Sequence, residues 1–145
     1  GGAGGGAGAG GAAGAGGAET LRGVAIGKNR LVGAALGTYH FTDGLYKPTA
    51  AREFNALTPE NEMKWDATER VRGQFTFQAG DALVQFAQEN GVKVRGHALV
   101  WHQALPAWVS TLTGEELRAA MVAHVKAVAA HFRGKVYAWD VVNEA

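Results

Sequence analysis

Apolar residues in this chain form short runs that alternate with stretches of helical spacing. Runs of strand length, bounded by glycine, proline or polar residues, predict four strands at about residues 31–38, 55–59, 92–97 and 135–144. Between them, helices are predicted from about 48 to 54, from 81 to 91 and from 113 to 134. Strands that alternate with helices in this way predict an α/β fold with a parallel sheet and right-handed crossovers.

The helix predicted from 113 to 134 has the clearest pattern. Thr113 and Glu116 have the T-x-x-E spacing of a capping box. An apolar stripe follows at spacings of four, four, three and four, formed by Leu117, Met121, Val125, Val128 and Phe132. We expect this stripe to face the sheet, and we expect His124 and His131 on the same helix to be solvated.

The first 18 residues contain only glycine and alanine. Such a segment has no side chains with which to build a core, so residues 1–18 are predicted to be a disordered tail or linker, and residues 19–145 one folded domain. The tail contains the spacing G-x-G-x-x-G, but no strand precedes it, which argues against a dinucleotide site. It also lacks the basic start and leucine-rich centre of a signal peptide.

Composition excludes several classes of function. The 145 residues carry a net charge of +1, which gives no electrostatic reason to expect nucleic acid as a partner. No apolar run reaches the length of roughly 18 residues that a membrane span needs, so no membrane association is expected. There is no cysteine, and therefore no disulfide framework.

Polar side chains gather where three of the predicted strands end. Glu60, Asn61 and Lys64 follow the second strand. His97 ends the third strand, with Trp101 and His102 in the loop after it, and Asn143 and Glu144 end the fourth strand. The carboxyl ends of parallel strands lie on one rim of the sheet, where active sites form. This mixture of carboxylate, amide, amine and imidazole groups beside an indole suits a polyhydroxylated neutral ligand better than a phosphate.

Glu144 is the candidate proton donor of this rim. A carboxyl group that follows an apolar strand suits a general acid with a raised pKa, and the adjacent Asn143 amide can hold a sugar hydroxyl. The plainer alternative is a strand that ends in a solvated glutamate.

The other rim residues also have structural alternatives. His97 alone can be a histidine that hydrogen-bonds a neighbouring loop. His97 and His102 together lack a third ligand at suitable spacing, so no metal is expected. Lys64 can form an ordinary surface ion pair with Glu60 or Glu62.

Three sequence blocks carry a family resemblance. They are TPENEMKW at 58–65, GHALVWH at 96–102 and WDVVNEA at 139–145. Together they resemble glycoside hydrolase family 10, the retaining endo-β-1,4-xylanases, from about Leu21 to the end of the chain. The resemblance implies a (β/α)8 TIM barrel of which this chain supplies roughly the first four βα units. It also implies xylan or xylo-oligosaccharides as ligand, no cofactor, and a secreted protein.

The same resemblance implies a role for each matching residue. Glu144 matches the general acid/base, and Asn143 matches the neighbour that holds the 2-hydroxyl of the sugar being cleaved. Contacts to the non-reducing side of the cleft are implied for Glu60, Asn61 and Lys64. His97 and Trp101 match residues that line the sugar nearest the scissile bond, and Trp65 matches a structural support.

The chain also departs from the family pattern. The family's nucleophile is a second glutamate after the seventh strand, and this sequence stops after the fourth, so none is expected in this chain. We therefore expect the chain alone to be inactive, and either to be poorly stable or to self-associate through its open barrel edges. Two alternatives remain open: another retaining barrel glycosidase, such as a cellulase or mannanase, and a non-catalytic sugar-binding half-barrel.

Overall fold

The computed structural model describes residues 19–145, so the prediction for the tail lies outside the described residues. Four strands form one parallel sheet, in which they lie side by side in chain order. They are β1 (Gly33–Leu36), β2 (Ala56–Pro59), β3 (Lys93–Trp101) and β4 (Ala138–Asn143). The predicted parallel α/β sheet is confirmed.

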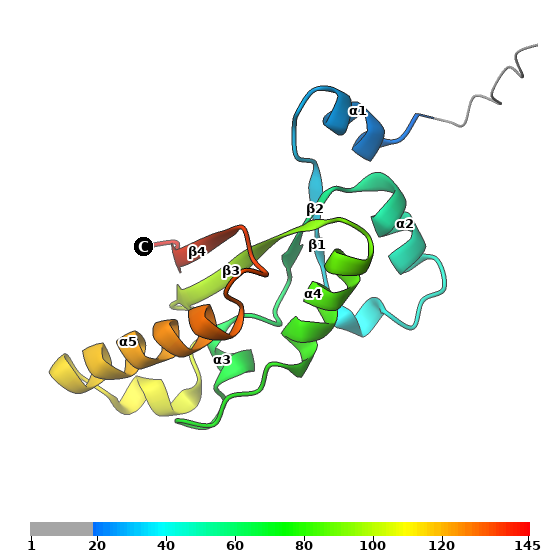
Figure 1. The fold of residues 1–145 in the computed structure, drawn as a ribbon. Helices are drawn as coiled ribbons and strands as arrows, with labels where there is room; N and C mark the ends of the chain where they lie inside the picture. The colour runs from blue at the N-terminus through cyan, green and yellow to red at the C-terminus, as the bar shows by residue number, and fades with distance from the viewer. Residues whose placement is uncertain (1–18) are drawn as a thin grey trace, which may run out of the picture.

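The longer helices lie along one side of this sheet (Figure 1). They are α2 (Tyr46–Glu53), α4 (Gln78–Glu89) and α5 (Gly114–His131). The core between helices and strands contains Leu57, Leu83, Val94, Val128 and Phe132. Among residues 19–145, no helix combines the length and the apolar character needed to cross a membrane.

β1 is two residues shorter at each end than predicted, and two other strand boundaries differ by more. β3 continues from His97 to Trp101, where we expected a loop, because Val100 and Trp101 pair with β4 after a register shift. β4 begins at Ala138 rather than at residue 135. The extension of β3 matters for the site, since it makes Trp101 part of the sheet.

Close contact between β3 and β4 depends on a glycine. The Trp139 ring lies across Gly96, where a Cβ atom would be only 2.3 Å from the indole. This space lets Trp139 pack against Phe132 in the core, with ring centroids 6.1 Å apart. Gly96 therefore fixes how β4, the strand that ends in Asn143 and leads to Glu144, is placed on β3.

Helix α5 begins where the sequence predicts, but not in the predicted way. Thr113 is its N-cap residue, yet the Thr113 side chain makes no capping hydrogen bond. Glu116 instead pairs with Arg72, at 2.8 Å. Val128 and Phe132 of the predicted stripe are fully buried, whereas Leu117 at the other end is 36% exposed. The stripe thus meets the sheet only along its carboxyl-terminal half.

Several short helices were not predicted: α1 (Leu21–Gly27), η1 (Thr38–His40), α3 (Trp65–Thr68) and η2 (Ala107–Thr111). Two glycines in the seven residues of α1 disfavour a helix. Tertiary contacts hold it, since the Arg22 guanidinium donates to the carbonyl oxygens of Ala51 and Asn90, each at 2.9 Å.

Candidate active site

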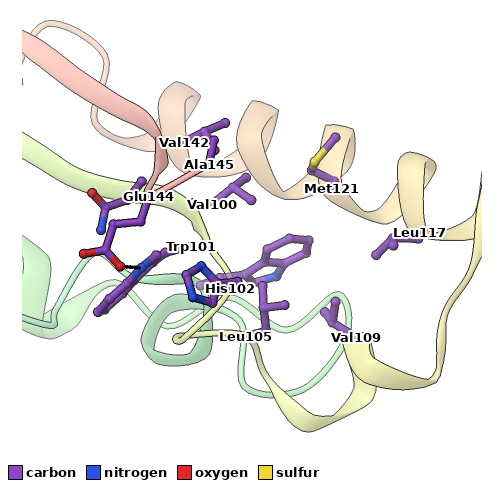
Figure 2. A pocket seen from close by; sticks show the side chains of 12 residues that line it. Val100, Trp101, His102, Leu105, Val109, Leu117, Met121, Val142, Glu144 and Ala145 are labelled. Carbon is purple, nitrogen blue, oxygen red and sulfur yellow. Dashed lines mark hydrogen bonds between the residues drawn. The ribbon is translucent and has the colours of Figure 1, made fainter.

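A chain of contacts joins the polar ends of β2, β3 and β4. The Lys64 ammonium donates to Asn61 Oδ1 at 2.9 Å and lies 4.8 Å from the centre of the Trp101 ring. The Trp101 indole Nε1 donates to Glu144 Oε2 at 2.9 Å (Figure 2). The structure therefore brings together four of the predicted site residues, from three different strand ends.

These contacts place a cation, an indole face and a carboxylate next to one another. Trp101 is half-buried and Glu144 is exposed, so a ligand can reach both. An indole face gives apolar area to the ring of a sugar, while ammonium, amide and carboxylate groups serve its hydroxyls. The arrangement suits a neutral carbohydrate.

Glu60 and Asn143 complete the part of the site at the strand ends. Glu60 follows β2 directly and is half-buried; its backbone amide donates to the carbonyl oxygen of Leu36 at 2.9 Å. Asn143 is the last residue of β4, and it pairs in register with Trp101. Glu60 is therefore next to Asn61, and Asn143 lies beside Trp101, at the rim where the sequence places them.

His97 is oriented by a carboxylate that sequence reasoning did not single out. Its Nδ1 lies 3.0 Å from Asp140 Oδ2, and the Arg95 guanidinium also pairs with Asp140. Hydrogen bonding from Arg95, and secondarily from His97, holds the pKa of Asp140 below its usual value. Asp140 thus stays ionised and fixes the His97 ring. The pairing of β3 with β4 sets His97 directly opposite Asp140, and this register is the feature from which the contact could have been predicted.

Glu62 was considered as an ion-pair partner of Lys64, and that alternative was wrong. Glu62 is buried, and its Oε1 accepts from both the backbone amide and the hydroxyl of Thr38. Its Oε2 accepts from the backbone amide of Asn61 at 2.9 Å. Glu62 therefore ties the end of β1 to the segment that carries Asn61 and Lys64.

A buried cluster lies behind this segment and corrects the prediction for His124, which is fully buried rather than solvated. His124 Nδ1 lies 2.9 Å from Glu69 Oε2, which also accepts from the Trp65 indole at 3.0 Å. Trp65 is 2% exposed and stacks on the imidazole at a ring distance of 4.4 Å, in keeping with a structural role. His131 is partly buried rather than solvated, and its Nε2 lies 2.7 Å from Asp81 Oδ1.

Burial lowers the pKa of His124, although Glu69 acts in the opposite direction. The unfolded chain takes up a proton at this histidine near pH 6.5, while the folded chain does so only at lower pH. The folded state therefore loses stability as pH falls below about 6.5, with a slope of at most about 1.4 kcal/mol per pH unit.

We expect His124→Asn to flatten this dependence, because the variant has no group there to protonate. Urea unfolding of both proteins between pH 7.5 and 5.5 measures the difference in slope. Equal slopes for the two proteins would contradict a lowered pKa at His124.

Beside Glu144, an apolar pocket of about 230 Å³ lies between the ends of β3 and β4 and helix α5 (Figure 2). Its wall includes Leu105, Leu117, Met121 and Val142. Sugar hydroxyls would find few partners among these side chains, so the pocket is not suited to a carbohydrate. Glu144 lies at its border and reaches across to Trp101.

A parallel sheet of βα units with polar side chains at the carboxyl ends of its strands, a carboxylate among them, fits the class of βα-barrel glycoside hydrolases. Within this class the chain belongs to glycosyl hydrolase family 10, whose family model matches residues 20–145. The fold is accordingly that of the first units of the family's (β/α)8 barrel, as predicted.

Named relatives agree with this assignment. The chain is 48% identical over 117 residues to a β-1,4-xylanase of Dictyoglomus thermophilum, and 51% identical over 96 residues to endo-1,4-β-xylanase 1 of Humicola insolens. These alignments cover 79% and 65% of this chain, but only 32% and 22% of the relatives. The chain thus spans a third or less of the length of these xylanases.

Solved structures of family 10 xylanases also resemble this chain over less than half of their own length. A glycosylated family 10 endo-β-1,4-xylanase of Gloeophyllum trabeum superposes with a TM-score of 0.83 at 49% identity, over 88% of this chain and 41% of that one. Xylanase 10B of Thermotoga petrophila, in complex with xylobiose, superposes with a TM-score of 0.82 at 42% identity. The superposition covers 88% of this chain and 40% of that one.

Proposed function

We propose that this chain supplies the proton-donor half of the catalytic barrel of an endo-β-1,4-xylanase. The observation that carries the proposal is the hydrogen bond between the Trp101 indole and the Glu144 carboxylate, with the Lys64 ammonium beside the same indole. Family membership and the xylobiose bound to the Thermotoga petrophila relative support xylan as substrate. Since xylan is a polymer outside cells, we also propose that the protein is secreted.

In the proposed mechanism, Glu144 donates its proton to the glycosidic oxygen as the bond to the sugar breaks. A second carboxylate forms the covalent glycosyl intermediate, and Glu144 then removes a proton from the water that hydrolyses it. Asn143 holds the 2-hydroxyl of the sugar being cleaved. His97 and Trp101 line that sugar, while Glu60, Asn61 and Lys64 bind its neighbour on the non-reducing side.

We further propose that the nucleophile lies outside residues 19–145. Retaining hydrolysis needs two carboxyl groups about 5–5.5 Å apart. Two of the carboxylates near the rim are already engaged: Glu62 by Thr38 and Asn61, and Asp140 by Arg95 and His97. A group bound in this way is poorly available to attack a sugar.

Calorimetric titration with xylobiose tests the sugar site. We expect saturable binding of xylobiose and weaker binding of cellobiose. Lys64→Met should weaken xylobiose binding by about tenfold to a hundredfold, because a hydrogen bond to a charged group contributes about 1.5–3 kcal/mol.

The matched control is Lys47→Met, because Lys47 has a similar contact with Phe41, 5.2 Å from the ring centre, that involves none of the proposed site residues. It should leave the affinity unchanged. Preference for cellobiose would favour another barrel glycosidase. Binding that Lys64→Met leaves intact would place the sugar elsewhere.

A further inference from the structure

Glu69 and His124 form a buried polar pair outside the rim. Their side chains are 6% and 0% exposed, and neither is among the residues proposed to bind sugar. Glu69 Oε1 accepts from the backbone amide of Gly73 at 2.8 Å, and Glu69 Oε2 accepts from Trp65 Nε1 and His124 Nδ1. The largely buried carboxylate thus has three hydrogen-bond donors.

Burying this polar pair costs free energy of folding, so its presence in the core needs a physical explanation. Because the carboxylate can only accept, the neutral His124 ring carries its proton on Nδ1. Its other nitrogen, Nε2, has no well-aligned hydrogen-bond partner within the described part of the chain, although the Leu99 backbone lies near the ring. An apolar side chain would avoid an unpaired buried atom of this kind.

The Glu69–His124 pair supports helix α3, which begins just after Lys64. Lys64 is the N-cap of α3, and its carbonyl oxygen accepts from the Thr68 amide and hydroxyl, each at 2.9 Å. The next residue, Trp65, is fixed on three sides: it bonds Glu69, stacks on His124, and meets the edge of Trp108 at 6.0 Å. A fixed Trp65 therefore fixes the backbone of Lys64, from which the lysine side chain reaches Trp101.

We propose that Glu69 and His124 are positioning residues that hold Lys64 beside Trp101, and so hold the Trp101 indole against Glu144. The connection runs from α5 through His124 and Glu69 to Trp65, and from there to Lys64 at the rim. The effect of Glu69 and His124 on sugar binding rests on the proposed function, whereas their effect on the position of the Trp101 indole does not.

The first readout is the indole N–H signals of the four tryptophans in a ¹⁵N-labelled sample of the whole chain. His124→Leu removes the donor to Glu69, and we expect the Trp65 and Trp101 signals both to shift. His124→Asn, whose amide nitrogen can replace Nδ1 as donor, should restore the Trp101 signal. His131→Leu is the matched control, since His131 lies on the same helix but contacts Asp81 and Phe77.

The second readout is xylobiose affinity in a double-mutant cycle. His124→Leu should weaken binding by about tenfold in the unaltered chain, but hardly at all when Lys64 is already methionine. A purely structural role would give the same loss in both backgrounds. If His124→Leu does not fold, Glu69→Gln takes its place in both experiments.

The inference is overturned if His124→Leu shifts the Trp65 signal but leaves the Trp101 signal unchanged. It is also overturned if the losses of xylobiose affinity caused by His124→Leu and Lys64→Met are additive in the double variant. Failure of the unaltered chain to bind xylobiose is a different result. It would remove the proposed function, while the Trp101 signal would still decide whether Glu69 and His124 position the rim.

Discussion

Replacing Glu144 by alanine should lower xylan hydrolysis by about 10²–10⁴-fold, the usual contribution of a general acid. The enzyme for this experiment is a closed barrel in which residues 19–145 are joined to the remaining strands of a family 10 relative, such as xylanase 10B of Thermotoga maritima. Without the Glu144 carboxyl group, the departing sugar must leave as an alkoxide, which is a poor leaving group. Release of reducing ends from xylan measures the rate.

Glu115→Ala is the matched control for this variant. It also removes a glutamate side chain, but one that is 91% exposed on helix α5 and pairs only loosely with Arg118, at 3.8 Å. We expect its rate to equal that of the unaltered barrel. Comparable losses in the two variants would mean that Glu144 has no special part in the reaction.

The second large effect concerns the chain by itself. We expect the 145-residue chain to release no xylo-oligosaccharides from xylan, and the closed barrel to release them steadily. The physical reason is that one carboxylate can protonate the leaving group but cannot also form the glycosyl intermediate. Chromatography of the products after equal incubation compares the two proteins.

A control for folding belongs with this comparison, because β1 and β4 each pair on one side only within the described sheet. Such open edges favour association between copies, and sedimentation at several concentrations tests for it. Steady turnover by the chain alone would refute the proposal that its nucleophile lies elsewhere. Adding the remaining strands as a separate polypeptide should restore activity if the two parts assemble.

The sequence predicted those features that depend on local pattern. Short apolar runs ending in polar residues located all four strands, and their alternation with helices gave the parallel order. Because parallel strands end on one rim, the meeting of Asn61, Lys64, Trp101 and Glu144 could be expected before the structure was known. The resemblance to family 10 then assigned a role to each.

The errors concern contacts between residues far apart in sequence. His124 was expected to be solvated because histidine is polar, although Val128 follows it by one helical turn; its partner Glu69 lies 55 residues away. The burial of Glu62 depends on Thr38, 24 residues upstream, and the fixing of His97 depends on Asp140, 43 residues downstream. Helical or strand periodicity contains no information on such pairs, and only the register between β3 and β4 indicates the one between His97 and Asp140.

The most direct measurement of the role of Glu144 is the dependence of kcat/KM on the leaving group in a series of aryl β-xylobiosides hydrolysed by the closed barrel. With Glu144 in place, the rate should vary little along the series. With Glu144→Ala, activated dinitrophenyl substrates should react almost normally, while phenyl substrates, which need protonation, should lose about 10²–10⁴-fold. An equal loss along the whole series would contradict the assignment of Glu144 as the proton donor.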